Sequence, residues 1–251
     1  MATVAVGDIH GNLQALEDLL AGLVPTLKRE DVLVFLGDYI DGGPDTRGCL
    51  ERIVHLNEEL PCPVVGVLGN HEVWMLRTLR DPTSHSWLIA TDALQTIASY
   101  SAEAAKLIWR EFNQAGHSLL TGKALPYEAF FDLVPSTHRA FLENLKPYYQ
   151  SADVLCVHGG APLNSGPLHL QPVETFIWGP EGFPDLYKSS EPVVYGHWGN
   201  AALNQDGWPS PNIMENKTYG IDTIAHGVLT AMRFPDGKVF QSGRHRMPSP
   251  A

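Results

Sequence analysis

The chain has 251 residues, of which 44% are hydrophobic and 18% are charged, an ordinary globular composition that argues against disorder. Its 28 Asp and Glu residues outnumber 17 Lys and Arg, giving a formal net charge of −11 that repels nucleic acid and acidic membranes, so neither is expected as a partner. The three cysteines form no CxxC pair, no run of about 18 apolar residues suits a membrane span, and the N-terminal apolar stretch is too short for a signal peptide, so we expect a cytoplasmic protein.

The first third of the chain alternates strands with helices. Three short apolar strands are expected, each ended by a glycine: Thr3–Val6, Val32–Leu36 and Val64–Leu68. Between the first two, leucines recur on one face of a helix that Asn12 caps, and Asp45 caps a second helix between the last two. A β-α-β-α-β order predicts a parallel sheet with helices on its faces, and therefore an α/β fold.

The middle of the chain reads as helical from residue 72 to 150. Helical periodicity marks four stretches: Met75–Leu79, Leu88–Tyr100, Ala104–Phe112 and Pro135–Leu145. We expect one domain over residues 1–251, with a helical cap-like insert at about 73–150. The part of it at Ser101–Tyr127 is expected to lie near the site and to select substrates by size.

The last third returns to strands. They are expected at Val154–Val157, Val193–Tyr195, Thr218–Ile221, Val228–Phe234 and Val239–Gln241. Pro235-Asp236-Gly237 predicts a hairpin with a type I′ turn, because Asp-Gly suits two positions with positive φ. Gly243–Ala251 is expected to be a frayed tail.

Residues able to bind metal follow the strands. After a glycine, the first three strands are followed by Asp8 and His10, by Asp38 and Asp41, and by Asn70 and His71, and two later strands end at His158 and His197. The carboxyl ends of parallel strands share one sheet edge, so these side chains should converge.

The mixture of ligand types indicates a metal centre. Two divalent ions about 3.5–4 Å apart need one bridging carboxylate and several terminal ligands. Imidazole, amide and carboxylate groups suit Mn²⁺, Fe or Zn²⁺ better than the oxygen shell of Ca²⁺. One such motif alone is usually a capped turn or a structural histidine, but five of them after five strands favour a metal site.

The motifs GD-x-H-G, GD-x-x-D-x-G, GNHE, HGG and GH, in this order, resemble the phosphoprotein phosphatase superfamily of calcineurin-like metallophosphoesterases. Within it the chain is similar to the bacterial branch of serine/threonine phosphatases and symmetrical diadenosine tetraphosphate hydrolases. The resemblance implies a central β-sandwich of mixed sheets flanked by helices, and two divalent ions, most often Mn²⁺. It implies the following ligands: Asp8, His10 and Asp38 for the first ion, and Asp38, Asn70, His158 and His197 for the second.

The same resemblance implies the chemistry. A hydroxide that bridges both ions attacks phosphorus in line, His71 protonates the leaving oxygen as general acid, and Asp41 orients the His71 imidazole. Two arginines that usually clamp the substrate phosphate are missing: Gly42 holds the first position, and the strip 176–181 lacks the second. Arg47, Arg77 or Arg80 are candidates to replace one of them, and His226 is a further candidate for substrate contact.

Three functions remain open from the sequence. The first is a serine/threonine-type phosphatase acting on phosphoproteins or small phosphoesters. The second is a phosphodiesterase or dinucleoside polyphosphate hydrolase, which the missing arginines favour. The third is an inactive phosphate- or metal-binding module, which should show eroded ligands, and none is eroded here. The sequence leaves the oligomeric state open.

Overall fold

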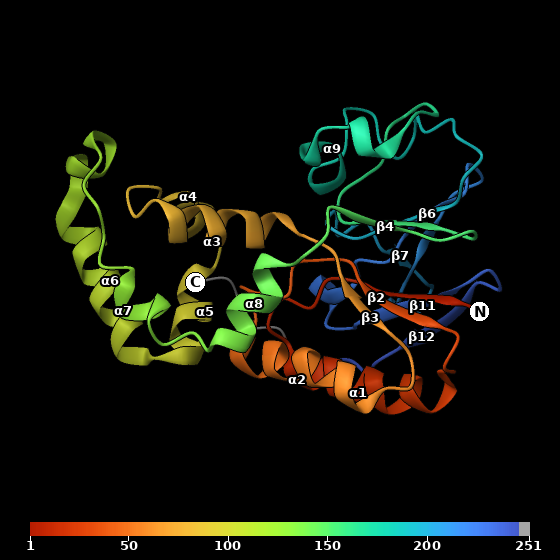
Figure 1. The fold of residues 1–251 in the computed structure, drawn as a ribbon, viewed down its shortest axis with the longest axis horizontal. Coiled ribbons are helices and arrows are strands. Elements are labelled where there is room, and N and C mark those ends of the chain that lie inside the picture. The colour runs from red at the N-terminus through yellow and green to blue at the C-terminus, as the bar shows by residue number, and fades with distance from the viewer. Residues whose placement is uncertain (246–251) are drawn as a thin grey trace.

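Two five-stranded sheets face each other in the computed structural model, which describes residues 1–245 (Figure 1). The first sheet has the order β12-β11-β1-β2-β3. Its strands are β1 (Thr3–Val6), β2 (Val32–Phe35), β3 (Val64–Gly66), β11 (Thr230–Phe234) and β12 (Lys238–Gln241). The second sheet has the order β4-β5-β6-β10-β9. Its strands are β4 (Tyr148–Gln150), β5 (Leu155–Val157), β6 (Val193–Tyr195), β9 (Asn212–Ile213) and β10 (Thr218–Gly220), and β7 (Ala202–Leu203) and β8 (Pro209–Ser210) form a separate pair.

Strand direction decides where the polar loops gather. β1, β2 and β3 run parallel, and β11 and β12 extend the sheet in antiparallel register. In the second sheet β5, β6 and β10 are parallel, whereas β4 and β9 are antiparallel to their neighbours. Both sheets are therefore mixed, and each sends the carboxyl ends of its parallel strands to one edge.

Apolar side chains fill the space between the sheets and cover their outer faces. Ala5 and Val34 of the first sheet lie in one buried cluster with Cys156 and Val194 of the second. Helices α1 (Leu13–Leu23) and α2 (Thr46–Glu59) pack on the other face of the first sheet, and α9 (Val173–Ile177) packs on the second. The expected β-sandwich flanked by helices is confirmed.

The two predicted helix caps are present. The Asn12 side chain accepts a hydrogen bond from the Ala15 amide at 3.1 Å, and Asp45 accepts one from the Gly48 amide at 2.8 Å. Each cap pairs a backbone N–H that the first turn of a helix leaves without a partner.

The helical insert extends sideways from the sheets (Figure 1). Its helices are α3 (Asn70–Arg80), α4 (Ser86–Ala90), α5 (Ala93–Tyr100), α6 (Ala102–Ala115), α7 (Glu128–Phe131) and α8 (Ser136–Glu143). Trp87 and Phe130 of the insert belong to the same buried cluster as Phe35 and Leu50, so insert and sheet share one hydrophobic core. The described residues also form 3₁₀ turns at Val24–Thr26, Gly116–Thr121, Leu168–Leu170 and Ile224–His226.

Four expectations need correction or restriction. The helix expected at Leu88–Tyr100 breaks between α4 and α5, where Thr91 has extended backbone. The stretch at 148–150 is strand β4 rather than part of the helical region, because it pairs with β5. The hairpin between β11 and β12 is present, but Gly237 alone of its turn residues has positive φ, so the turn is not type I′. Most of the expected frayed tail, residues 246–251, lies outside the described residues.

Among the described residues, no helix has the length and apolar character needed to cross a membrane. The three cysteines are buried free thiols, as expected.

Candidate metal centre

Five strand ends deliver the six predicted metal ligands to one place. Asp8 and His10 lie in the loop after β1, Asp38 lies in the loop after β2, and Asn70 is the first residue of α3. His158 and His197 follow β5 and β6. Contacts between side chains and the main chain join the two sheets here. His158 Nδ1 lies 3.0 Å from the Leu36 carbonyl oxygen, and the His197 amide donates to Asp8 Oδ2 at 2.9 Å. The convergence expected from strand order is thus realised across both sheets.

Asp38 lies at the middle of this group. Its Oδ2 is 3.6 Å from His10 Nε2, and its Oδ1 is 3.4 Å from His158 Nε2, which is in turn 2.9 Å from Asn70 Oδ1. Two clusters of possible ligand atoms share Asp38, and within each cluster the atoms lie within 4.8 Å of one another: one includes His10 and His71, the other His158 and His197. His71 belongs to the first cluster by proximity, although its predicted role is that of general acid. One carboxylate common to two ligand clusters is the arrangement that a pair of divalent ions requires.

The charge state of these groups fits cation binding. Asp8 Oδ1 is buried and has no hydrogen-bond partner. Burial raises the pKa of Asp8 well above its ordinary value, and the nearby Asp222 and Asp38 carboxyls raise it further, so a cation would relieve both effects. Burial and the neighbouring His158 lower the pKa of His197 to about 4, which leaves its imidazole neutral and able to coordinate. The residues present therefore fit two divalent ions.

The backbone is strained at several of these positions. His10, Asp38, Asp41 and His197 have φ of 46°, 49°, 68° and 65°. For a residue other than glycine this conformation costs about 1–2 kcal/mol. Such strain persists where the surrounding structure fixes it, and it concentrates at functional sites.

Glu72 fixes the loop that carries Asp38. Its buried carboxylate accepts hydrogen bonds from the amides of Asp38, Tyr39, Ile40 and Gly69 at 3.0, 2.9, 3.3 and 3.1 Å. Burial, with the charge of Asp38, raises the pKa of Glu72 to about 7. Glu72 was assigned no role from the sequence. Its bond from the Gly69 amide is one half of a capping box, but the glycine cap lacks the side chain that marks such a box in a sequence.

His71 and Asp41 form a hydrogen-bonded pair beside the ligands. His71 Nδ1 lies 2.8 Å from Asp41 Oδ2, and its Nε2 lies 3.7 Å from Asp38 Oδ2. Burial alone would lower the pKa of His71, but the Asp38 and Asp41 carboxyls raise it to about 9. Asp41 also accepts hydrogen bonds from Thr96 Oγ1 at 2.6 Å and Trp87 Nε1 at 3.0 Å. Neither donor was predicted, because Thr96 and Trp87 lie 55 and 46 positions from Asp41 and no local pattern marks them.

A cavity of about 440 Å³ opens beside the ligands. His10, His71, His197, Trp198, Asp92 and Asp222 are among its lining residues. Neither lysine nor arginine belongs to the described residues that line it. Asp92, in the break between α4 and α5, is also among the lining residues. The described lining includes no residue of the segment 101–127 that was expected near the site, and helix α6 of that segment lies at the end of the insert away from the sheets (Figure 1).

The residues expected to replace the missing phosphate clamp are not at the cavity. The guanidinium of Arg47 lies 5.8 Å from the centre of the Tyr100 ring and faces the insert. Arg77 and Arg80 are exposed in the last turn of α3, at the end of the helix remote from His71. His226 follows two lining residues but does not line the cavity itself. The structure thus leaves the substrate contacts predicted for Arg47, Arg77 and His226 without geometric support.

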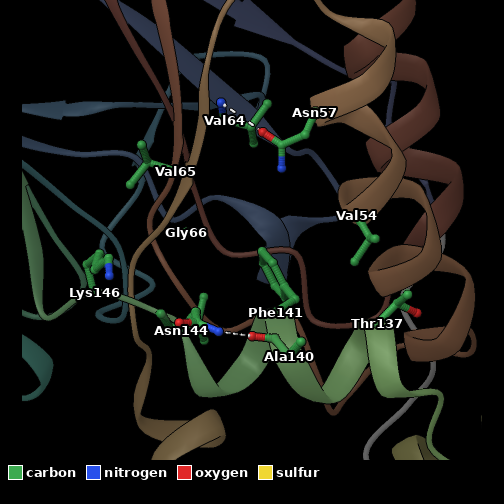
Figure 2. A pocket seen from close by; sticks show the side chains of 11 residues that line it. Val54, Asn57, Val64, Val65, Gly66, Thr137, Ala140, Phe141, Asn144 and Lys146 are labelled. Carbon is green, nitrogen blue, oxygen red and sulfur yellow. Dashed lines mark hydrogen bonds between the residues drawn. The ribbon is translucent and has the colours of Figure 1, made fainter.

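A second cavity, of about 400 Å³, lies between α2, β3 and α8 (Figure 2). Its lining is mostly apolar, with Val54 and Phe141 facing each other across it, whereas the Val65 side chain points to the other side of β3 and Lys146 lies at one side. The described lining residues include no carboxylate and no imidazole, so this cavity does not offer the chemistry of the metal centre.

Comparison with known proteins agrees with this geometry. A zinc-dependent endopolyphosphatase of Saccharomyces cerevisiae is 30% identical over 100 residues, which make up 40% of this chain and only 29% of that protein. A symmetrical bis(5′-nucleosyl)-tetraphosphatase of Legionella pneumophila is 25% identical, with 96% of each chain covered. The fold is shared with a solved protein serine/threonine phosphatase from Saccharomyces cerevisiae, at a TM-score of 0.54 and 13% identity, covering 100% of this chain and 81% of that one.

The family comparison covers most of the molecule. The calcineurin-like phosphoesterase family matches residues 1–227, which include all six strand-end ligands and the His71–Asp41 pair. The chain therefore belongs to the calcineurin-like phosphoesterase family.

Proposed function

We propose that this enzyme hydrolyses substrates in which the reacting phosphate is linked through oxygen to two groups. This class includes phosphodiesters and dinucleoside polyphosphates. The observation that supports this substrate class is a cavity beside the Asp38 clusters whose described lining has no lysine or arginine. A dianionic monoester normally needs a guanidinium to take the oxygens that the ions leave free. A phosphodiester group carries one negative charge and a second ester substituent, so it needs less positive charge and more space than a monoester. Gly42, which lines the cavity, leaves that space.

Two divalent ions, Mn²⁺ first among them, complete the proposed site. Their ligands would be Asp8, His10, Asp38, Asn70, His158 and His197. When bound, such ions polarise the phosphoryl group and acidify water at neutral pH. His71 acts as general acid, since the Asp41 carboxylate holds its Nδ1 and leaves Nε2 turned toward Asp38, where it delivers a proton to the leaving oxygen.

The relatives support the same class. The names of the two curated relatives describe enzymes that act on polyphosphates and on dinucleoside tetraphosphates. In both substrates the phosphorus under attack has oxygen-linked groups on two sides. A phosphoprotein substrate, expected from the resemblance to serine/threonine phosphatases, stays a prediction that the same assay tests.

The test is a substrate panel with added Mn²⁺. Bis(p-nitrophenyl) phosphate, diadenosine tetraphosphate, p-nitrophenyl phosphate and a phosphoserine peptide are compared by kcat/KM, with Asp38→Asn protein prepared in parallel to measure contaminating phosphatases. We expect kcat/KM to be higher for the first two than for the last two. A preference for p-nitrophenyl phosphate and the phosphopeptide would contradict the proposal and return the enzyme to the monoesterases.

A further inference from the structure

A row of aromatic rings borders the metal centre. The ring centroid of His71 lies 6.1 Å from that of Trp74, and Trp74 lies 5.1 Å from Trp178. Trp178 is 5.6 Å from His197, and His197 is 4.9 Å from Trp198. The row thus links the proposed general acid to a metal ligand through contacts between neighbouring rings, and it ends at the cavity with Trp198.

Trp198 is held in place although much of it faces solvent. Its side chain is 45% exposed, yet its indole Nε1 donates a hydrogen bond to the Gly159 carbonyl at 2.7 Å. The next amide, that of Gly199, donates to Asp222 Oδ2 at 2.7 Å and fixes the loop from the other side. An exposed indole with a fixed edge has lost its rotational freedom without burying its surface, so a planar partner can stack on it at low entropic cost.

The cavity offers this aromatic surface in place of positive charge. Asp92 and Asp222 are its carboxylate members, and the described lining contains no lysine or arginine to attract an additional phosphate. A neutral planar group avoids repulsion from these carboxylates and gains contact area on Trp198. The chemistry of the wall therefore fits an aromatic ester group, such as a nucleobase, better than a peptide carrying acidic residues.

We propose that Trp198 is a specificity residue that stacks on the nucleobase, or on an equivalent aromatic ester group, of a substrate whose phosphorus lies at the Asp38 clusters. Trp178 also packs against the His197 ring, at 5.6 Å between ring centroids. This inference rests on the proposed function and names the organic part of its substrate.

The test separates the base from the rest of the nucleotide. AMP and D-ribose 5-phosphate carry the same phosphorylated ribose and differ only in the base, and their dissociation constants are measured calorimetrically on the Mn²⁺-loaded full chain. We expect wild-type protein to bind AMP roughly tenfold or more tightly than ribose 5-phosphate. Trp198→Leu should weaken AMP binding roughly ten- to hundred-fold, the usual worth of one stacked base, while ribose 5-phosphate changes less than about twofold.

Two controls sharpen the comparison. Trp109→Leu removes an indole of similar exposure, 47%, from α6, where it stacks on Phe112 away from the cavity, and it should leave both constants unchanged. Trp198→Phe keeps an aromatic face and should retain most of the AMP affinity. If Trp198→Leu does not fold, as judged by thermal melting, the wild-type difference between the two ligands and the phenylalanine variant decide the matter.

Equal affinities of wild-type protein for AMP and ribose 5-phosphate would overturn the proposal. An equal loss for both ligands in Trp198→Leu would also overturn it, because the indole would then act only through His197 and the ions. These readouts are independent of turnover. A substrate panel that favours monoesters would reject the proposed function. Stacking would still be supported if the difference between the dissociation constants of AMP and ribose 5-phosphate disappears in Trp198→Leu.

Discussion

Replacing Thr96 with valine tests whether the insert controls the proposed general acid. The Thr96 hydroxyl donates to Asp41 Oδ1 at 2.6 Å and accepts from the Asp41 amide at 2.8 Å. Valine has nearly the same shape but makes neither bond. Asp41 is fully buried, so water cannot replace the lost partners.

The expected magnitude follows from these two bonds. A hydrogen bond to a charged group contributes about 1.5–3 kcal/mol, and a buried amide left unpaired costs about 1–3 kcal/mol. The free energy of unfolding should therefore fall by roughly 2.5–6 kcal/mol, which at this chain length lowers Tm by roughly 5–20 °C. With one hydrogen bond fewer, the Asp41 carboxylate should also hold the His71 imidazole less firmly, which slows any reaction whose leaving group must receive a proton.

Two measurements check this expectation. Thermal melting gives Tm, and kcat for an alkyl phosphodiester, whose leaving group needs a proton, reports on the His71–Asp41 pair. In Thr96→Val this kcat should fall more than kcat for bis(p-nitrophenyl) phosphate, whose leaving group hardly needs a proton. Thr121→Val serves as the matched control, because its exposed hydroxyl bonds a main-chain carbonyl in the insert. An unchanged Tm together with an unchanged ratio of the two kcat values would refute the reasoning.

Four further outcomes are expected. Asp38→Asn should abolish turnover and reduce metal content, since Asp38 is shared by both ligand clusters, and retention of two ions per chain would count against the two-metal site. His71→Asn should keep the metals and slow hydrolysis by about 10²–10⁴-fold, with a smaller loss for a nitrophenolate leaving group than for an alkoxide. In metal-free protein the pKa of His71 is raised to about 9 from 6.5, so protonated His71 stabilises the folded state. The contribution of His71 to the free energy of unfolding should be complete below about pH 6.5 and decline by about 1.4 kcal/mol per pH unit up to about 9. Urea titration of wild-type and His71→Asn protein measures this contribution as the difference between their two pH profiles. Gly42→Arg should raise the ratio of monoesterase to diesterase rates roughly tenfold, the worth of about one charge-assisted hydrogen bond. Its Cβ would meet His10 at 3.5 Å, an ordinary contact, but φ of +79° costs about 1–2 kcal/mol, so a thermal melt must first show that it folds.

The sequence predicted the sheet, and it predicted which polar side chains gather at the sheet edge, because both depend on local patterns. Short apolar runs closed by glycine give the strands, and the rule that parallel strands share a carboxyl edge brings Asp8, Asp38 and Asn70 together. The six ligands were named from their motifs, and the structure places them in one group.

What the sequence did not predict depends on contacts between distant segments. Trp87 and Thr96 reach Asp41 only because α4 and α5 fold back over it, and nothing near either residue indicates that contact. Strand β4 was assigned to the helical region because its three residues, Tyr148–Gln150, are too few to show alternation; pairing with β5 defines it. Arg47 was a candidate phosphate ligand by charge alone, but its position on α2 directs it toward Tyr100.

If the proposed ligands hold the metals, their left-handed backbone limits which metals this site can be engineered to accept. Apart from glycine, the side chains that tolerate positive φ best are those of Asn, Asp and His, the types found at His10, Asp38 and His197. Exchanging ligands within that set changes the coordination chemistry while keeping the loop conformation. Cys would favour a softer ion and Glu a harder one, but neither tolerates positive φ well. Either substitution would therefore strain the backbone as well as change the ligand geometry. Libraries that aim to change the metal preference should therefore vary only Asp, Asn and His at these three positions.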